Sequence, residues 1–277
     1  MGEEWHWDET LYAGSASHYR IGRMPYPAEL GRAIGAELGL DGTGRLLDVG
    51  CGPGALTLVL APLFAHAVGV DADPDMLVEA RRAAARLAVT NVEWRRSRAE
   101  DLPAGLGEFR VVAFAQSFHW MDRPLVASRV RGMLDPGGAW VHVGAVTHRG
   151  VPGEDMLPYP RPPWDRIDGL VAAHLGPLRR AGQGVLPNGT SGGEEEIMRE
   201  AGFRGPVRLE VGGGEVVERG VDEIVSAVFS LSGSAPHLFG DRVPDFEARL
   251  RRLLGQESPA GRFSERLREI TAVIWRP

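Results

Sequence analysis

The segment Leu46-Leu-Asp-Val-Gly-Cys-Gly-Pro-Gly54 decides how this chain folds. It starts as an apolar run of β type, passes into closely spaced glycines and continues into the apolar, helical run of residues 55–64. Glycines at such a place let the backbone turn sharply and approach a ligand without a Cβ atom in the way. The first N–H groups of the following helix stay free to bind that ligand. The segment therefore predicts a strand, a ligand-binding turn and a helix.

A carboxylate follows this loop at a sequence spacing that suits binding of a nucleoside. Asp71 stands 19 residues after Gly52, at the end of a second predicted strand, residues 66–70. A carboxylate there accepts hydrogen bonds from the ribose hydroxyls of a nucleoside that lies across the strand ends. Three interpretations stay open at this point. The loop holds an adenosine-containing cofactor; or Gly50-x-Gly52-x-x-Ala55 is a dinucleotide fingerprint; or the loop is a structural turn beside a surface acid.

Strand-like and helical segments alternate on either side of the loop. Strands that alternate with helices pair in parallel through right-handed crossovers, which predicts an α/β fold with helices on both faces of the sheet. The predicted strands are residues 45–49, 66–70, 92–94, 109–114, 139–146, 206–211 and 270–275. The predicted helices are residues 27–39, 55–64, 75–87, 125–134, 164–175, 194–201, 221–231 and 244–254. The turn-forming segment Asp135-Pro-Gly-Gly138 is expected to end the preceding helix before the fifth strand begins.

The order of the predicted strands and helices indicates one core with two insertions. Residues 1–149, 194–212 and 266–277 form the expected cofactor-binding core. Residues 150–193 and 213–265 are rich in proline, glycine and extra helical patterns, and we expect them to form a small cap that binds substrate.

Composition excludes several classes of function. The chain has 31 basic and 37 acidic residues among 277, a net charge of −6 that disfavours a nucleic-acid surface. The single cysteine, Cys51, permits neither a disulfide nor a cysteine-based zinc site, and no other metal site is indicated. No apolar run reaches the ~20 residues that cross a bilayer, and the acidic first ten residues do not resemble a secretory signal. We expect a cytoplasmic monomer or homodimer without a membrane partner.

Four segments, in this order, resemble the motifs of class I S-adenosylmethionine-dependent methyltransferases. They are Leu46–Gly54 as quoted above, Gly69-Val-Asp-Ala-Asp-Pro-Asp-Met-Leu77, Ala99-Glu-Asp-Leu-Pro103 and Leu134-Asp-Pro-Gly-Gly138. The resemblance covers roughly residues 19–146. It implies a Rossmann-like sheet, mostly parallel with an antiparallel last strand. It also implies S-adenosylmethionine as cofactor and S-adenosylhomocysteine as product.

The resemblance also implies a set of cofactor-binding residues. Asp48 and the loop would hold the methionine end, Asp71 the ribose, and the segments after the second and third strands the adenine. Arg98 stands where relatives often have an aspartate, and its side chain cannot accept a hydrogen bond from the adenine amine. The full set is Tyr19, Arg23, Asp48, Gly50, Cys51, Gly52, Gly54, Asp71, Ala72, Met76, Ala99, Glu100, Asp101, Gln116, Ser117 and Trp120.

The segment after the fourth strand, Ala115-Gln-Ser-Phe-His-Trp-Met-Asp122, resembles that of small-molecule methyltransferases, including the trans-aconitate methyltransferase-like branch. It differs from the Asn/Asp-Pro-Pro-Tyr motif of enzymes that methylate base or glutamine amines. His119 is the candidate general base, because its ordinary pKa suits proton transfer near neutral pH. The alternative is a structural ring beneath Trp120.

Two aspects of the site stay open in the sequence. Tyr19 and Arg23 either close over the sulfonium and the methionine carboxylate or belong to a core segment. Trp120, Phe229 and His237 are the candidate acceptor-binding residues, with Trp164 beside them in the cap. The acceptor would be an oxygen or nitrogen nucleophile such as a carboxylate or a natural-product hydroxyl. A NAD-linked oxidoreductase and a non-catalytic protein that binds S-adenosylmethionine are the alternative functions.

Overall fold

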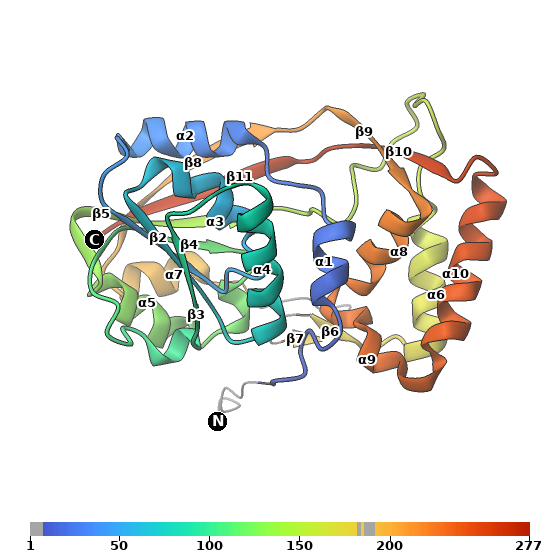
Figure 1. Ribbon diagram of the computed structural model, residues 1–277, viewed down its shortest axis with the longest axis horizontal. Coiled ribbons are helices and arrows are strands. Elements are labelled where there is room, and N and C mark those ends of the chain that lie inside the picture. Colours follow the sequence, from blue (N-terminus) through green and yellow to red (C-terminus); the bar gives the residue numbers. More distant parts are fainter. Residues whose placement is uncertain (1–7, 182–183, 186–191) are drawn as a thin grey trace.

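The computed structural model describes residues 8–181, 184–185 and 192–277. Among these, seven strands form one sheet in the order β3-β2-β1-β4-β5-β11-β8 (Figure 1). The strands of this sheet are β1 (Arg45–Val49), β2 (His66–Asp71), β3 (Val92–Arg96), β4 (Phe109–Ala115), β5 (Leu134–Gly144), β8 (Arg204–Gly212) and β11 (Glu269–Arg276). Strands β1 to β5 pair in parallel, and β11 runs antiparallel to both β5 and β8. The predicted sheet is confirmed, including its antiparallel last strand.

Helices cover both faces of the sheet, as the sequence predicts. On one face, α2 (Ala28–Leu38) and α3 (Ala55–Leu60) bury leucine and isoleucine side chains against β1, β4, β5 and β11. On the other face, α5 (Arg123–Arg131) and α7 (Glu194–Glu200) pack around the fully buried Trp140 and Trp275. The helix α4 (Pro74–Arg86) follows β2, and Asp73 caps its first turn by accepting from Asp75 N. These two apolar layers fix the sheet whose loops carry the site.

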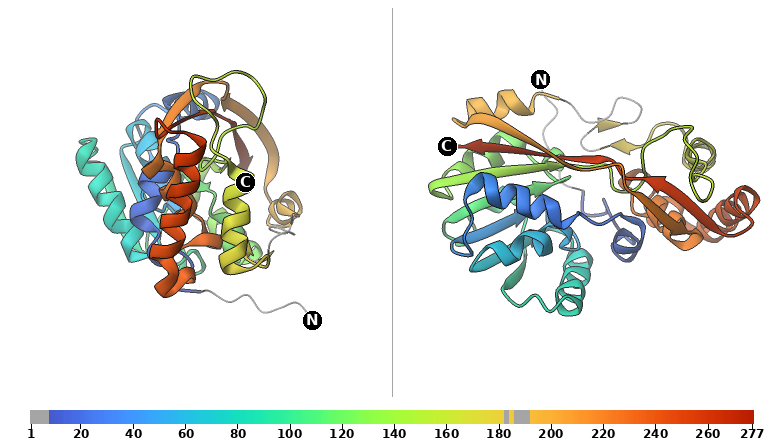
Figure 2. Two further views of the ribbon diagram at one scale, coloured as in Figure 1. Left: turned by 90° about the vertical axis from the view of Figure 1, so that its right-hand side faces the viewer. Right: turned by 90° about the horizontal axis from the view of Figure 1, so that it is seen from above.

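The second part of the molecule lies beside the sheet, as the view from above shows (Figure 2). It consists of α6 (Trp164–Leu175), α8 (Val221–Phe229), α9 (Pro236–Phe239) and α10 (Val243–Glu257), which share a third apolar core. A two-stranded antiparallel ribbon of β9 (Val216–Gly220) and β10 (Arg262–Arg266) joins this cap to β8 and β11. The helix α1 (Ala16–Gly22) lies between the sheet and α8 (Figure 1).

Several boundaries differ from the prediction. The segment Asp135-Pro-Gly-Gly138 lies within β5 rather than ahead of it, and the register shifts there between Phe109 and Val111 of β4. The irregularity of pairing accommodates the proline and glycines. The helix before it ends at Arg131, and α1 and the ribbon were not predicted. The predicted glycine-rich loop before residue 194 lies partly outside the described residues. Its described part holds the two-residue strands β6 (Arg180–Ala181) and β7 (Gly184–Val185).

Candidate functional site

A cleft of about 770 Å³, its open mouth included, lies where β1, β2 and β4 end. Loops that leave the carboxyl ends of parallel strands form the ligand sites of open α/β sheets. The cleft is lined by Glu9, Leu11, Tyr12, Tyr19, Gly50, Gly52, Asp71, Ala72, Asp73, Met76, Ser97, Arg98, Ala99, Glu100, Ala115, Gln116, Ser117, Trp120 and Met121. Most of the predicted cofactor-binding residues are therefore brought together.

The glycine loop presents its backbone to this cleft. Gly50 and Gly52 adopt positive φ angles of 66° and 53°, in the region that glycine occupies without strain. A Cβ atom on Gly50 would lie 2.5 Å from Ser117 Cβ, whereas a Cβ atom on Gly52 would meet no atom within 4 Å. The backbone at Gly52 thus borders open space, and a ligand in that space can contact the backbone closely.

Asp71 joins the loop to the end of β2. Its Oδ2 accepts from Gly52 N at 2.7 Å, and its Oδ1 accepts from Asp73 N at 2.9 Å. Desolvation raises the pKa of this carboxyl to about 6, although the two N–H donors oppose the rise. At neutral pH the carboxylate is a hydrogen-bond acceptor at the floor of the cleft, which is the role that a ribose requires.

Asp48 lies deeper, inside β1, and does not line the cleft. It is fully buried, and its Oδ2 accepts from Thr57 Oγ1 at 2.5 Å. Its Oδ1 is buried without a hydrogen-bond partner in the described part of the chain. Burial raises the pKa of Asp48 to about 7, since a charged carboxylate loses its hydration there.

Aromatic side chains wall one side of the cleft. The ring of Tyr12 lies edge-on to Trp120 at a centroid distance of 5.9 Å and to Tyr19 at 6.3 Å. Desolvation raises the pKa of the Tyr12 phenol, which stays neutral. The wall excludes water from the space above the loop and offers flat apolar surface to a ligand.

This wall rests on the cap. Ser15 Oγ donates to the carbonyl of Phe229 at 2.8 Å, just before α1. Arg23, which follows α1, donates from Nε to Ser230 Oγ at 2.8 Å. At Gly22, a Cβ atom would lie 2.1 Å from the backbone nitrogen of Ala227 in α8, so only glycine permits this approach. The position of the aromatic wall is therefore fixed by the helix behind it.

Residues 46–138 match the model of a family described as a methyltransferase domain. This stretch of the chain, which holds the glycine loop and Asp71, is thus similar to a methyltransferase domain. The ubiquinone biosynthesis O-methyltransferase of Cereibacter sphaeroides (strain ATCC 17025 / ATH 2.4.3) is 38% identical over 115 residues, 41% of this chain and 46% of that protein. An uncharacterized methyltransferase of Mycobacterium bovis is 36% identical over 132 residues, 47% of this chain and 51% of the relative. The chain thus spans about half the length of the curated relatives it matches.

Solved structures resemble the whole fold of the methyltransferase domain together with its cap region. One from Anaeromyxobacter dehalogenans, described as a candidate type II methyltransferase, has a TM-score of 0.52 at 21% identity and covers 91% of this chain and 95% of that one. The structure named DhpI-SAM-HEP complex has a TM-score of 0.50 at 18% identity and covers 97% and 95%. At these identities the likeness concerns the fold alone.

Some predicted residues of the methyltransferase domain lie outside the cleft. Gly54 faces Trp94 instead, because a Cβ atom on Gly54 would lie 2.5 Å from Trp94 Cη2. Cys51 is buried beneath the loop, where desolvation raises the pKa of its thiol, so it is no nucleophile. Asp101 is exposed in the short helix after β3. Arg23 turns to the cap, with its guanidinium 4.5 Å from the ring centroid of Tyr19.

His119 does not face the cleft of the methyltransferase domain. It lines a separate hollow together with Arg123, His142 and Glu194. Desolvation and the neighbouring His142 lower the pKa of His119 to about 4, so it is uncharged at neutral pH. The placement does not fit the predicted role as a base toward a substrate in the cleft, because the ring borders another cavity.

The predicted acceptor residues of the cap also lie elsewhere. Phe229 is 1% exposed in the cap core, in contact with Phe239 and Phe246. His237 is exposed, with Nδ1 3.1 Å from the carbonyl of Ala13. Trp164 Nε1 donates to Glu265 at 2.8 Å at the base of the cap. Only Trp120 of the predicted acceptor residues lines the cleft.

Sequence reasoning missed part of the cleft. Leu11 and Tyr12 come from an N-terminal segment that carries no motif. Asp73 and Met121 belong to motif segments but not to the predicted set, and Ser97 precedes the third of these motifs. The prediction that Tyr19 closes over the cofactor was the one signal for this part of the cleft. In the described part of the chain, no group of three or more histidine, cysteine or acidic side chains is arranged to hold a metal ion. Within that part, too, every helix is too short or too polar to span a membrane.

Proposed function

We propose that this chain transfers a methyl group from S-adenosylmethionine to a small-molecule acceptor. The observation that carries the proposal is the meeting of the open backbone at Gly52 with the Asp71 carboxylate, at the carboxyl edge of a parallel sheet. The match of this region to a methyltransferase family supports it.

The cleft residues fit the cofactor in three places. Asp71 would accept hydrogen bonds from the ribose hydroxyls. Its ionised carboxylate is a strong acceptor, and two backbone N–H groups hold it in position. Met76 and Ala99 would enclose the adenine with apolar surface, and the backbone of Gly50 and Gly52 would border the methionine end. When bound, the cofactor supplies a sulfonium methyl group, which passes to the acceptor as the carbon–sulfur bond breaks and its electron pair remains on sulfur.

The protein contributes alignment and a dry site. Holding the two reactants at contact distance supplies much of the rate in a displacement of this kind. Tyr12, Tyr19 and Trp120 shield the space above the loop from water. We infer that His119 takes no proton in the transfer, because its ring lines another hollow. An oxygen nucleophile is the favoured acceptor atom, since the Cereibacter relative is named an O-methyltransferase.

We also propose the division of labour that the sequence suggests. Residues 1–149, 194–212 and 266–277 would bind the cofactor, and residues 150–193 and 213–265 would shape the acceptor side. The separate apolar core of the cap and its attachment through the β9–β10 ribbon support this division.

Binding of S-adenosylhomocysteine tests the proposal. The product should raise the melting temperature, as any ligand of the native state does. Asp71→Ala should weaken its binding by about 1–3 kcal/mol, since a charge-assisted hydrogen bond is lost. Asp75→Ala, a nearby acid exposed in the first turn of α4, is the matched control and should bind normally. Calorimetry measures both variants; stabilisation by NAD without stabilisation by S-adenosylhomocysteine would favour the oxidoreductase instead. Methyl transfer to a panel of acceptors excludes a purely binding role.

A further inference from the structure

A second hollow adjoins the cleft at the ends of β4 and β5. It encloses about 1,190 Å³, open solvent included. It is lined by Gln116, Gly144, Ala145, Val146, Val151, Gly214, Arg266, Leu267, Arg268, Glu269 and Thr271. Gln116 lines both this hollow and the cofactor cleft, so the two spaces share one wall. A molecule in the second hollow is therefore next to the cleft from which a methyl group would come.

The two arginines of this hollow differ in their partners. Arg266 pairs with Asp155 at 2.7 Å through Nη2 and donates from Nη1 to the carbonyl of Gly214. Arg268 is half-buried, and within the described residues it donates one hydrogen bond, from Nε to the carbonyl of Gly150 at 3.1 Å. Arg266 thus has a carboxylate partner, whereas no carboxylate of the described residues lies within 4.0 Å of the Arg268 guanidinium. The two terminal nitrogens of the Arg268 fork are thus available to an anion, whose two oxygens they match in geometry.

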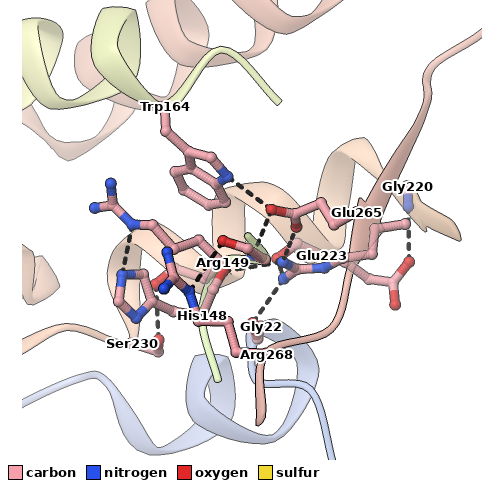
Figure 3. A network of polar contacts seen from close by, with 12 residues as sticks. Gly22, His148, Arg149, Trp164, Gly220, Glu223, Ser230, Glu265 and Arg268 are labelled. Atoms are coloured by element: carbon pink, nitrogen blue, oxygen red, sulfur yellow. Dashed lines mark hydrogen bonds and ion pairs between the residues drawn. The ribbon is translucent and has the colours of Figure 1, made fainter. Parts of the chain in front are cut away.

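Arg268 belongs to a network of polar contacts that contains several arginines (Figure 3). Desolvation and the guanidiniums of Arg23, Arg149, Arg219 and Arg268 hold the pKa of His148 well below its usual range. The carboxylates of this network have other partners: Asp168 pairs with Arg149, Glu265 pairs with Arg219, and Glu223 accepts from Gly220 N. The guanidinium charge of Arg268 is therefore not offset by an ion pair within the described residues, which favours an incoming anion.

The residues that line the two hollows beside Arg268 indicate in which of them such an anion would bind. Arg268 also borders a further hollow, whose lining includes Glu29 and Glu215, and these acids repel negative charge. The second hollow itself has one acid, the exposed Glu269, and an apolar wall of Ala145, Val146 and Val151. An apolar wall beside one cation is the arrangement that binds a hydrocarbon group with a single carboxylate.

We propose that the methyl acceptor is a small carboxylate whose anionic group is bound by Arg268 in the second hollow, with its nucleophilic atom directed past Gln116 into the cofactor cleft. This inference rests on the proposed methyltransferase function. It adds a substrate class and a specificity-determining residue to that function.

The experiment measures binding of matched anionic and neutral probes. Benzoate and hexanoate, with benzamide and hexanamide as neutral counterparts, are titrated by calorimetry into the protein saturated with S-adenosylhomocysteine. Both carboxylates should bind more tightly than their amides. Arg268→Gln should weaken carboxylate binding about tenfold or more, because a charge-assisted hydrogen bond is lost. Arg268→Lys should restore part of the affinity, since it keeps the charge but not the fork.

Arg262→Gln is the matched control. Arg262 lies at the start of β10, exposed and paired with Glu218, and does not line the hollow. It should bind the probes as the unmodified protein does. The proposal is overturned if neither carboxylate binds, if the amides bind equally well, or if Arg268→Gln leaves carboxylate binding unchanged. Affinity for S-adenosylhomocysteine, measured first in every variant, separates these outcomes from failure of the methyltransferase function, in which the product itself would not bind.

Discussion

Gly52 and Gly54 stand two positions apart in one motif, yet their surroundings differ. Both have positive φ angles, 53° and 81°, so a side chain strains the backbone at either position. Only Gly52 borders open space, whereas Gly54 is covered by the ring of Trp94. The motif thus contains one glycine for a ligand and another for the packing of its own domain.

Replacing each of these glycines by alanine should separate the two roles. Gly52→Ala and Gly54→Ala both incur the strain of a left-handed residue, about 1–2 kcal/mol. Gly52→Ala should in addition weaken S-adenosylhomocysteine binding at least about tenfold, because its methyl group enters the ligand's space. Gly54→Ala should lose more stability, because its methyl group meets Trp94. Urea unfolding and calorimetry measure the two effects; an equal loss of product affinity in both variants would contradict the distinction.

Asp48 should make stability depend on pH. Its folded-state pKa of about 7 lies above the unfolded value of 3.8, so between these values the folded state retains a proton that the unfolded state has lost. Stability from this group therefore falls as pH rises through that window. Asp48→Asn removes the titration, and its stability relative to the unmodified protein should improve between pH of about 5 and about 8.

The control for this prediction is Asp41→Asn. Asp41 is exposed, and hydrogen bonds from Thr43 lower its pKa, so its titration lies below the tested window. The stability difference between Asp41→Asn and the unmodified protein should stay constant there. Urea unfolding at both pH values gives the comparison, and a flat result for Asp48→Asn would show that Asp48 is ionised throughout.

At the scale of elements, the alternating core was predictable and the connection to the cap was not. The central strands β1, β2 and β4 are mostly buried apolar runs, and the helix α6 was predicted with the bounds it has. The ribbon was missed because β9, Val216-Val-Glu-Arg-Gly220, is short and carries charged residues. Its Arg219 is 4% exposed, and burial of an arginine depends on a partner, Glu265, that is 46 residues away.

The same limit applies to the site. Gly50, Gly52 and Asp71 were predictable because motif spacing fixes them within one unit of β1, the glycine loop, α3 and β2. The wall residue Tyr12 and the second hollow depend on tertiary packing of segments far apart in sequence. His119 shows the converse: its position after β4 suggested the cleft, but the short helix Phe118–Trp120 presents its ring to another cavity.

The buried pair of Arg219 and Glu265 should dominate the stability of the ribbon. Arg219 also donates to the carbonyls of Gly22 and His148, and Glu265 accepts from Gly150 N and Trp164 Nε1 (Figure 3). Glu265→Gln leaves the arginine charge buried without compensation and should lower the free energy of unfolding by about 3–5 kcal/mol.

The exposed pair on the same ribbon supplies the control. Glu218 pairs with Arg262 in open solvent, and Glu218→Gln should change stability by less than about 1 kcal/mol. Thermal and urea unfolding compare the two variants. Equally small losses of unfolding free energy in the two variants would show that the buried pair stabilises the protein no more than the surface pair does.

At the scale of the molecule, the cap has its own core and holds the aromatic wall of the cleft through α1. Phe229→Ala empties the centre of that core and should lower the free energy of unfolding by about 3–5 kcal/mol. His237→Ala, at an exposed position on the same cap, should stay within about 0.5 kcal/mol of the unmodified protein. Unfolding by urea, followed by the fluorescence of the tryptophans, distinguishes them. A near-neutral Phe229→Ala would mean that the cap core repacks freely.

The place at which the cap enters and leaves the sheet has a consequence for engineering. Gly212 and Glu269 are register partners on adjacent strands, so the two ends of the intervening segment are neighbours before any of that segment folds. Joining them by a short hairpin would re-route no strand and cross no connection. The segment between Gly212 and Glu269 can accordingly be exchanged as a unit. Residues 164–175 have to be exchanged together with it, because α6 contributes to the apolar core of the cap. Because α8 of this segment holds the aromatic wall of the cleft, a replacement has to keep the close approach of α8 to Gly22 if the donor site is to stay unaltered.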